Sequence, residues 1–332
     1  MVKVAVAGGT GSTHLIPYPT RKLLRIVDVA TEFLRAPFRS GNHEITIFTR
    51  SNPANPSRDV AYKIVDYYNR ASLTEALSGF DACLSFLVAH LDPDCEVQKN
   101  LIHACIEAGI KRFAPSEWAL KSYSECEPYA NKDIIVEYLH ELKEEDKLGG
   151  MEYCLFQPSF FMDYFAHPYS LSPNLITWPF NIDFENRRAM VLDDGDQPIV
   201  LTAISDVSEM LSLALSDPEP WPVVGGMRGC KTNLNEILAL GKKLRGGEWT
   251  IDHIKGEDIV NGELKSTWLP IFSHPVIPDE NRENFSREFA VMAFRSILNG
   301  SWDVSDEWNT RKPDFAFVGL EEYLTKAWDG KP

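Results

Sequence analysis

The hydrophobic positions of this 332-residue chain change their spacing along its length. Short apolar runs bounded by glycine and turn residues are typical of buried strands, whereas apolar positions three and four residues apart are typical of helices. Runs of the first kind predict six strands in the first half of the chain, at residues 2–7, 44–50, 61–66, 82–87, 111–116 and 151–159.

Helical spacing occupies the segments between these strands. Residues 72–81 predict a short helix, in which Ser72 and Glu75 have the spacing of a capping box. Residues 95–109 predict a longer helix that Gly109 ends in a left-handed conformation, and 131–147 predict an amphipathic helix. Alternating strands and helices indicate an α/β fold, a doubly wound parallel sheet with right-handed crossovers.

The pattern changes after Pro158, where aromatic residues and prolines crowd the segment FFMDYFAHPYSLSPNLITWPF. We therefore expect two domains. The first, 1–158, is a nucleotide-binding domain, and the second, 159–332, is a smaller mixed α/β lobe for a substrate, with some elements that return to the first sheet.

Two helices and a late strand are expected in this second lobe. The helices lie at 206–215 and 233–244, where Asp206 and Asn233 are the expected N-caps, and the strand lies at 249–254.

Charge and composition exclude several classes of function. A net charge of −15 disfavours nucleic-acid binding, which needs clustered Lys and Arg against phosphate. The six cysteines form no C-x-x-C pair, and His90 and His167 have no companions at ligand spacing, so we expect neither a metal site nor disulfides. No apolar segment is long enough to cross a membrane, and no charged leader precedes the first strand. We expect a cytoplasmic protein, a monomer or a homodimer.

A glycine-rich turn follows the first strand, in the sequence VAVAGGTG. In a dinucleotide-binding turn, glycines allow a tight reversal and a close approach of the backbone to the pyrophosphate. Gly8, Gly9 and Gly11 meet these two requirements, whereas His14 stands where a third glycine would allow close packing of the helix. The alternative is a turn that only connects a strand to a helix.

The residue at the end of the second strand indicates whether the cofactor is NAD or NADP. An acidic residue there receives the ribose hydroxyls of NAD, whereas a basic residue accommodates the additional phosphate of NADP. Arg50 follows Thr49 at this position, and its planar guanidinium can hold a phosphate with two hydrogen bonds. This position predicts NADP(H) as the cofactor. The alternative is an arginine on a solvated loop.

Four segments together carry a family resemblance: VAVAGGTG, FTRS after the second strand, RFAPSEWA after the fifth, and NKDIIVEYL behind it. The chain resembles the NmrA-like and isoflavone reductase-like group of atypical short-chain dehydrogenases, in particular its fungal members. The resemblance implies a Rossmann NAD(P)-binding domain with a small substrate lobe, and NADPH as the cofactor. It also implies these site residues: Gly8, Gly9, Thr10 and Gly11 for the pyrophosphate, Arg50 for the 2′-phosphate, Ser116 after the fifth strand, and Pro158 to Phe161, including Phe160, at the nicotinamide.

Lys132 matches the family's proposed acid/base or nicotinamide-orienting lysine. Hydride delivery to a carbonyl or conjugated alkene builds negative charge on an oxygen, which an ammonium group can stabilise or protonate. The alternative is an ordinary charge on an amphipathic helix, as expected of Lys121, Lys143 and Lys147. Tyr129 stands three residues before Lys132, not four as in typical short-chain dehydrogenases, and we interpret it as structural.

An aromatic cluster follows the sixth strand, at Phe160, Phe161, Tyr164 and Phe165. It could line a pocket for a flat ligand, although aromatic stripes more often belong to a core.

The segment 12–40 is about a dozen residues longer than one helix and turn of this kind need. Pro17 and Pro19 move the expected start of its helix to Thr20, with Phe33 or Leu34 facing the sheet. Three explanations stand. The extension is a loop over the cofactor, it prevents normal cofactor binding, or it reflects a wrongly assigned splice junction. The third is favoured, because residues 40–50 resume the family pattern without a break.

These observations favour an NADPH-dependent oxidoreductase that reduces a small aromatic or polyketide-like metabolite in fungal secondary metabolism. An inactive NmrA-like dinucleotide sensor that regulates a partner protein is the alternative, which the altered position His14 favours and Lys132 disfavours. A relative of sugar-nucleotide epimerases is a third hypothesis, disfavoured by the absence of Tyr-x-x-x-Lys.

Overall fold

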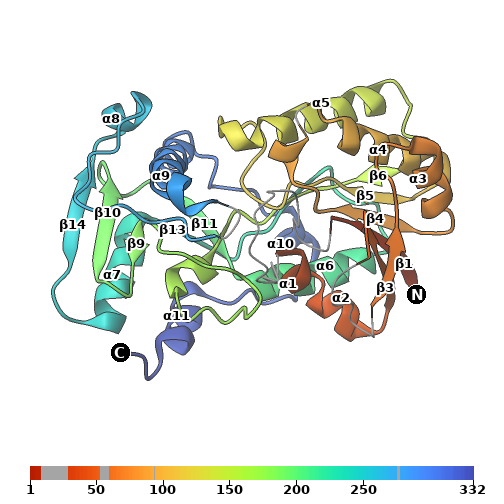
Figure 1. The fold of residues 1–332 in the computed structure, drawn as a ribbon. Helices are drawn as coiled ribbons and strands as arrows, with labels where there is room; N and C mark the ends of the chain where they lie inside the picture. Colours follow the sequence, from red (N-terminus) through yellow and green to blue (C-terminus); the bar gives the residue numbers. More distant parts are fainter. Residues whose placement is uncertain (9–28, 53–59, 93, 275–276) are drawn as a thin grey trace. The chain divides into compact units, whose positions relative to one another are not determined.

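The computed structural model describes residues 1–8, 29–52, 60–92, 94–274 and 277–332 (Figure 1). Two compact units make up the chain. The first comprises Met1–Glu117, Pro128–Phe156 and Ser208–Gly225, and the second comprises Trp118–Glu127, Gln157–Val207 and Gly226–Pro332. The domain boundary expected at residue 158 stays a prediction, because each of these units combines several separate segments of the chain.

A six-stranded sheet in the order β3-β2-β1-β4-β5-β6 forms the centre of the first unit. Every neighbouring pair is parallel, and β1 lies between β2 and β4, with Val4 opposite both Ile45 and Ala82. This order is that of a doubly wound Rossmann sheet, so the predicted fold class is confirmed. The strands are β1 (Val2–Ala7), β2 (His43–Thr49), β3 (Ala61–Ile64), β4 (Ala82–Ser85), β5 (Arg112–Ala114) and β6 (Glu152–Tyr153).

Burial explains the apolar run from Val4 to Ala7 in β1. The side chains from Val4 to Ala7 are fully buried, as expected of a strand with helices on both faces of its sheet. Figure 1 shows α3, α4 and α5 on one face of the sheet, and α2 with the Ser208–Leu215 part of α6 on the other. The sixth predicted strand is broken at Cys154, after which β7 (Leu155–Gln157) begins.

The helices of the first unit end largely where the sequence predicts. Gly109 closes α4 in the left-handed conformation, with φ 74°, so that expectation is confirmed. The capping box at Ser72 is wrong, because the helix begins one turn earlier and the side chain of Asn69 accepts a hydrogen bond from the Ser72 N–H. The helices are α1 (Val29–Phe33), α2 (Arg35–Ser40), α3 (Arg70–Leu77), α4 (Glu96–Ala108) and α5 (Ala130–Glu144), with 3-10 turns η1 (Ala89–Leu91) and η2 (Glu127–Tyr129).

Part of the glycine turn and of the extension lies outside the described residues, namely Gly9, Thr10, Gly11, His14, Pro17, Pro19 and Thr20. The described part of the extension ends in α1 and α2. Phe33 and Leu34 are both buried, as expected, and the ring of Phe33 meets that of Phe86 edge-on beyond β4.

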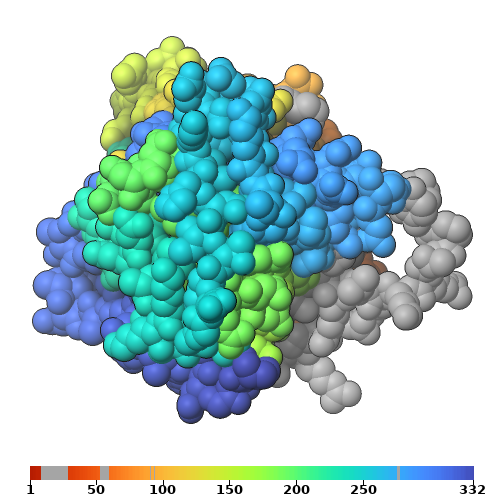
Figure 2. All heavy atoms as spheres, turned by 90° about the vertical axis from the view of Figure 1, so that its left-hand side faces the viewer, coloured from red at the N-terminus to blue at the C-terminus, as the bar shows by residue number. Residues whose placement is uncertain are grey.

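Two three-stranded sheets and a set of helices form the second unit, shown in Figure 2 from the side of β14 and α8. One sheet has the order β14-β10-β9 and the other β13-β11-β8. Its strands are β8 (Phe160–Phe161), β9 (Ile182–Asp183), β10 (Arg188–Leu192), β11 (Ile199–Thr202), β13 (Cys230–Thr232) and β14 (Thr250–Ile254). Its helices and 3-10 turns are η3 (Met162–Ala166), α7 (Leu234–Arg245), α8 (Gly256–Val260), η4 (Asp279–Asn281), α9 (Arg282–Leu298), α10 (Glu307–Arg311) and α11 (Leu320–Trp328). Strand β12 (Val224–Gly226) and helix α6 (Ile204–Leu215) each have residues in both units.

The two expected N-caps of this part of the chain have different outcomes. Asn233 caps α7, where its side chain accepts a hydrogen bond from the Glu236 N–H at 2.8 Å. Asp206 lies inside α6 instead of before it, and its carboxylate accepts the Val318 N–H at 2.7 Å. None of the helices in the described ranges is long and apolar enough to cross a membrane.

Candidate functional site

The carboxyl ends of the parallel strands meet at one edge of the six-stranded sheet. Ala7 of β1 lies opposite both Phe48 of β2 and Ser85 of β4, at the point where the strand order reverses. In open α/β sheets, ligands bind in the crevice at such a switch point. Gly8 and Arg50 follow two of these strands directly.

Gly8 occupies a position that only glycine fits. Its φ is +83°, and a Cβ there would lie 2.7 Å from the backbone carbon and oxygen of Phe86. The chain leaving β1 therefore passes directly against the chain leaving β4. The left-handed φ of Gly8 allows the tight reversal that a pyrophosphate-binding turn requires of its first glycine.

Tyr67 supports this turn, although the sequence analysis did not identify it. Its buried hydroxyl donates a hydrogen bond to the Phe48 carbonyl at 3.2 Å, and the Gly8 backbone also hydrogen-bonds to it. Burial raises the pKa of the Tyr67 hydroxyl far above its ordinary value, so the group stays protonated. Tyr67 thus joins the end of β2 to the start of the glycine turn. Its neighbour Tyr68 is exposed, and nothing in the sequence distinguishes the two.

Arg50 lies on an exposed turn directly after β2. The hydroxyl of Thr49, which is buried, accepts a hydrogen bond from the Ser51 N–H at 3.0 Å. This bond turns the chain at Arg50 and leaves the arginine side chain in solvent, where a phosphate could reach it.

Lys132 lies in the first turn of α5 and is half-buried. Its ammonium group donates a hydrogen bond to the main-chain carbonyl of Glu117, which follows β5. The same group lies 3.9 Å from the centre of the Tyr129 ring, in a cation–π contact. Tyr129 therefore contacts the lysine from the helix entrance, without the four-residue spacing of a typical short-chain dehydrogenase.

Asn131 fixes the start of α5, and sequence reasoning did not identify this residue either. Its amide nitrogen donates to the Ala89 carbonyl at 2.9 Å and to the Asp92 carbonyl at 2.7 Å. Both carbonyls belong to the segment that follows β4. The first turn of α5, which carries Lys132, is thereby attached to the edge where the strands end.

The remaining candidates divide between the two units. Ser116 is half-buried in a tight turn of the first unit, where the Glu117 N–H donates to the Pro115 carbonyl at 2.8 Å. Pro158 and Phe160 belong to the second unit. There Phe160 stacks on Trp302 and on Phe180, with ring centres 4.7 Å and 4.4 Å away.

In the described part of the chain, no group of three or more His, Cys, Asp or Glu side chains could hold a metal ion.

The chain belongs to the NmrA-like family, whose model matches residues 33–324. This confirms the resemblance drawn from the sequence. The chain is 24% identical to "Oxidoreductase swnN" of Arthroderma benhamiae over 80% of its own length and 90% of that protein. It is also 24% identical to "Isoflavone reductase homolog IRL" of Zea mays, over 81% of its length and 82% of that protein.

Solved structures show the same fold at lower sequence identity. A crystal structure of isoflavone reductase has a TM-score of 0.67 at 17% identity and covers 98% of both chains. The binary complex of leucoanthocyanidin reductase with NADPH from Vitis vinifera also has a TM-score of 0.67, at 16% identity, and covers 98% of this chain and 99% of that one.

Proposed function

We propose that this protein is an NADPH-dependent oxidoreductase that reduces a small aromatic or polyketide-like metabolite. Its family and the oxidoreductase names of its relatives support the class of enzyme. The left-handed conformation of Gly8, directly after β1 at the switch point of the sheet, is the observation that carries the proposal, because it allows the tight reversal of a dinucleotide-binding turn.

Each candidate residue has a role in this proposal. The amides from Gly8 to Gly11 hold the pyrophosphate, and Arg50 holds the 2′-phosphate. NADPH, when bound, supplies the hydride. Pro158 and Phe160 belong to the segment that lines the nicotinamide, and Ser116 is a further cofactor-binding residue.

Lys132 is the proposed catalytic residue. Its ammonium group, oriented by the Glu117 carbonyl and the Tyr129 ring, stabilises or protonates the oxygen on which negative charge develops. A lysine with a carbonyl on one side and an aromatic face on another is restricted in orientation, which reduces the entropy lost on engaging a substrate.

Its setting in the cell is part of the same proposal. The fungal origin of relatives such as "Oxidoreductase swnN" supports a place in fungal secondary metabolism. The six cysteines are all free, as is usual for a protein of a reducing compartment such as the cytoplasm.

Cofactor titration tests the proposal. NADPH should bind more tightly than NADH, measured by quenching of tryptophan fluorescence, and Arg50→Ala should remove that preference by weakening NADPH alone. Arg287→Ala, at an exposed position on α9, is the matched control and should leave both affinities unchanged. Equal affinities in the parent protein would refute the assignment of NADP(H). Tight NADPH binding with no oxidation of the cofactor by any reducible compound would indicate a dinucleotide sensor instead.

A further inference from the structure

The helix that carries Lys132 begins without a capping side chain. The N-cap residue of α5, Tyr129, makes no side-chain capping hydrogen bond with the described residues, and its own backbone is helical, with φ −101° and ψ −2°. The N–H groups of a first turn have no acceptor within their helix, so an uncapped turn frays readily. Lys132 lies in that turn, and its direction therefore depends on some other support.

Asn131 provides this support through three hydrogen bonds to residues that follow β4. Its amide nitrogen donates to the Ala89 carbonyl at 2.9 Å and to the Asp92 carbonyl at 2.7 Å. Its main-chain carbonyl accepts the thiol S–H of Cys95 at 3.5 Å. Adjacent residues of an α-helix point about 100° apart around the helix axis, so the bonds of Asn131 also fix the direction in which Lys132 leaves the helix.

The two carbonyls that accept from this amide are themselves held in place. The Ala89 carbonyl also accepts the Asp92 N–H at 3.1 Å, and the Asp92 carbonyl also accepts the Cys95 N–H at 2.9 Å. A carbonyl oxygen has two lone pairs and can accept both bonds. The buried Asp92 carboxylate accepts two N–H groups in the first turn of α4, those of Val97 at 3.2 Å and Gln98 at 3.0 Å. The start of α5 is therefore attached to the start of α4.

The lysine side chain needs support at both of its ends. Its ammonium group is held by the Glu117 carbonyl, beyond β5. A lysine has a flexible four-carbon stem, so a contact at the tip alone leaves many conformations open. The bonds of Asn131 hold the other end, at the main chain. Residues after β4 and after β5 thus define the position of Lys132 together.

We propose that Asn131 is a positioning residue that sets the place of the Lys132 ammonium group at the carboxyl edge of the sheet. This inference rests on the proposed function of Lys132. Stabilisation or protonation of a substrate oxygen depends on close alignment, and a displacement of about 1 Å can slow a reaction about a hundredfold. Asn131 acts through the helix and donates none of its hydrogen bonds to the ammonium group.

Chemical labelling of Lys132 tests the positional role without cofactor or substrate. Acetic anhydride acylates amines, and mass spectrometry of the full chain after digestion gives the rate at Lys132 relative to Lys143, which is exposed on the same helix. In Asn131→Ala this relative rate should rise about fivefold, because the loss of ordinary hydrogen bonds releases the first turn more often. Asn131→Leu has a side chain of similar size without a donor and should give the same rise.

A matched asparagine in the second unit separates positioning from a general loss of stability. The Asn235 amide nitrogen also donates to two acceptors, the Asp194 carbonyl at 2.7 Å and the Asp196 carboxylate at 2.8 Å. Asn235→Ala should therefore lower the melting temperature, as Asn131→Ala does, but leave the relative labelling of Lys132 unchanged. Equal labelling in the parent and Asn131→Ala would overturn the inference, and so would the same rise in Asn235→Ala.

Turnover distinguishes a failure of this inference from a failure of the proposed function. With menadione, or another reducible aromatic compound that the parent accepts, kcat for NADPH oxidation should fall about tenfold in Asn131→Ala while the Kd for NADPH changes little. Asn235→Ala should keep the parental kcat. Faster labelling with full kcat in Asn131→Ala would overturn the positioning role. Faster labelling in Asn131→Ala, in a parent that oxidises no NADPH, would support the link between Asn131 and Lys132 and refute the proposed function.

Discussion

The ammonium group of Lys132 donates a hydrogen bond to the main-chain carbonyl of Glu117, three residues beyond the end of β5. A backbone carbonyl can orient an ammonium group without neutralising its charge, which a carboxylate would do. In the proposed function, this hydrogen bond and the Tyr129 ring orient the ammonium group for its catalytic role.

Replacement of Lys132 by methionine should separate chemistry from cofactor binding. Lys132→Met keeps the length and apolar stem of the side chain but removes the proton donor. We expect kcat for NADPH oxidation to fall about a hundredfold or more, while the Kd for NADPH changes little. Lys143→Met, at an exposed position of the same helix, is the control and should behave as the parent. Unchanged turnover in Lys132→Met would assign the catalytic role to another residue.

Gly8→Ala should weaken NADPH binding and lower stability for two separable reasons. The left-handed conformation alone costs a residue with a Cβ about 1–2 kcal/mol. At Gly8 the added methyl group would also overlap the Phe86 backbone, at 2.7 Å. Gly79 shares the same φ of +83° but has nothing within 4 Å of its Cβ position, so Gly79→Ala measures the conformational cost alone.

The comparison of these two variants by thermal unfolding and NADPH titration tests the close approach of the backbone. Gly8→Ala should unfold at a lower temperature than Gly79→Ala and should bind NADPH more weakly than the parent. Gly79→Ala should retain parental cofactor affinity. Equal melting temperatures for the two variants would mean that the chain at Gly8 has room for a side chain, contrary to the geometry.

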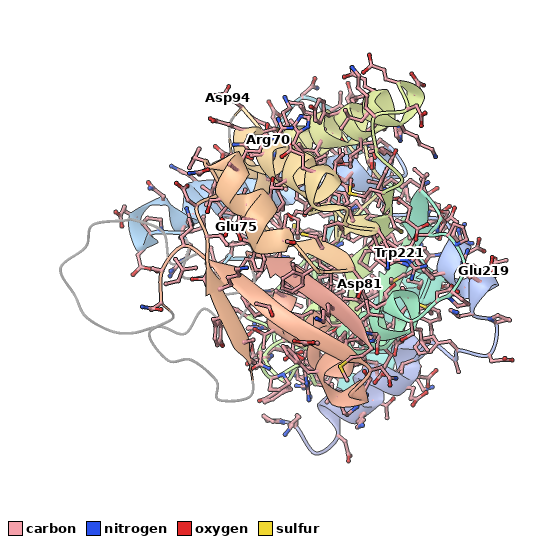
Figure 3. All side chains as sticks on the ribbon, turned by 90° about the vertical axis from the view of Figure 1, so that its right-hand side faces the viewer. Arg70, Glu75, Asp81, Asp94, Glu219 and Trp221 are labelled. Atoms are coloured by element: carbon pink, nitrogen blue, oxygen red, sulfur yellow. The ribbon has the colours of Figure 1, made fainter. Side chains whose placement is uncertain are left out.

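Arg112 holds the segment Ser208–Gly225 against the sheet of the first unit. Its guanidinium donates to the Glu152 carboxylate at 2.6 Å and to the Glu219 carbonyl at 2.8 Å, and it lies 5.3 Å from the Trp221 ring centre. Figure 3 shows Glu219 and Trp221 beside the strands. Only 15% of the arginine side chain is exposed, so these contacts are largely shielded from solvent.

Arg112→Met should therefore destabilise the protein by about 3 kcal/mol, since it leaves a half-buried carboxylate and several carbonyls without their donor. The neighbouring Lys111 forms an ion pair with Asp81 at 3.0 Å, but 76% of its side chain is exposed. Lys111→Met should cost about 1 kcal/mol or less. Urea unfolding of the two variants checks the contrast, and equal shifts of the midpoint would show that the arginine contacts add nothing beyond a surface ion pair.

The elements that could be predicted from the sequence are those whose signals are local. Val4 and Val6 belong to a short apolar run that is typical of a strand covered on both faces. Gly109 ends a helix through its own backbone conformation, and Asn233 begins one through its own side chain. The capping box predicted at Ser72 is wrong because a second local signal competes with it. Asn69 has the same capping chemistry one turn earlier, and the intervening residues are compatible with a helix.

The parts of the site that could not be predicted depend on contacts between distant segments. The partners of Arg112 lie about a hundred residues further along the chain, at Ala214 and Glu219. Tyr67 acquires its role only because β2 and the glycine turn meet at one edge of the sheet.

His43 should make the stability of the first unit depend on pH. Its Nε2–H donates to the Ser212 carbonyl at 3.2 Å, while Nδ1 is buried without a partner among the described residues. Burial lowers the pKa of the imidazole below its ordinary value of 6.5, because the charged form is desolvated. The neutral form thus contributes stability that is complete above pH 6.5 and is lost as the pH falls through the folded-state pKa.

His43→Gln keeps a donor for the Ser212 carbonyl but removes the titrating group. The variant should lose less stability than the parent between about pH 7.5 and pH 5.5, a range that spans the ordinary pKa of histidine. Other half-buried histidines, such as His167 and His274, also have lowered pKa values and contribute a common loss to both proteins. The difference between the two urea midpoints as a function of pH is therefore the informative quantity. A difference that stays constant across the range would mean that His43 takes up its proton equally easily in the folded and the unfolded chain.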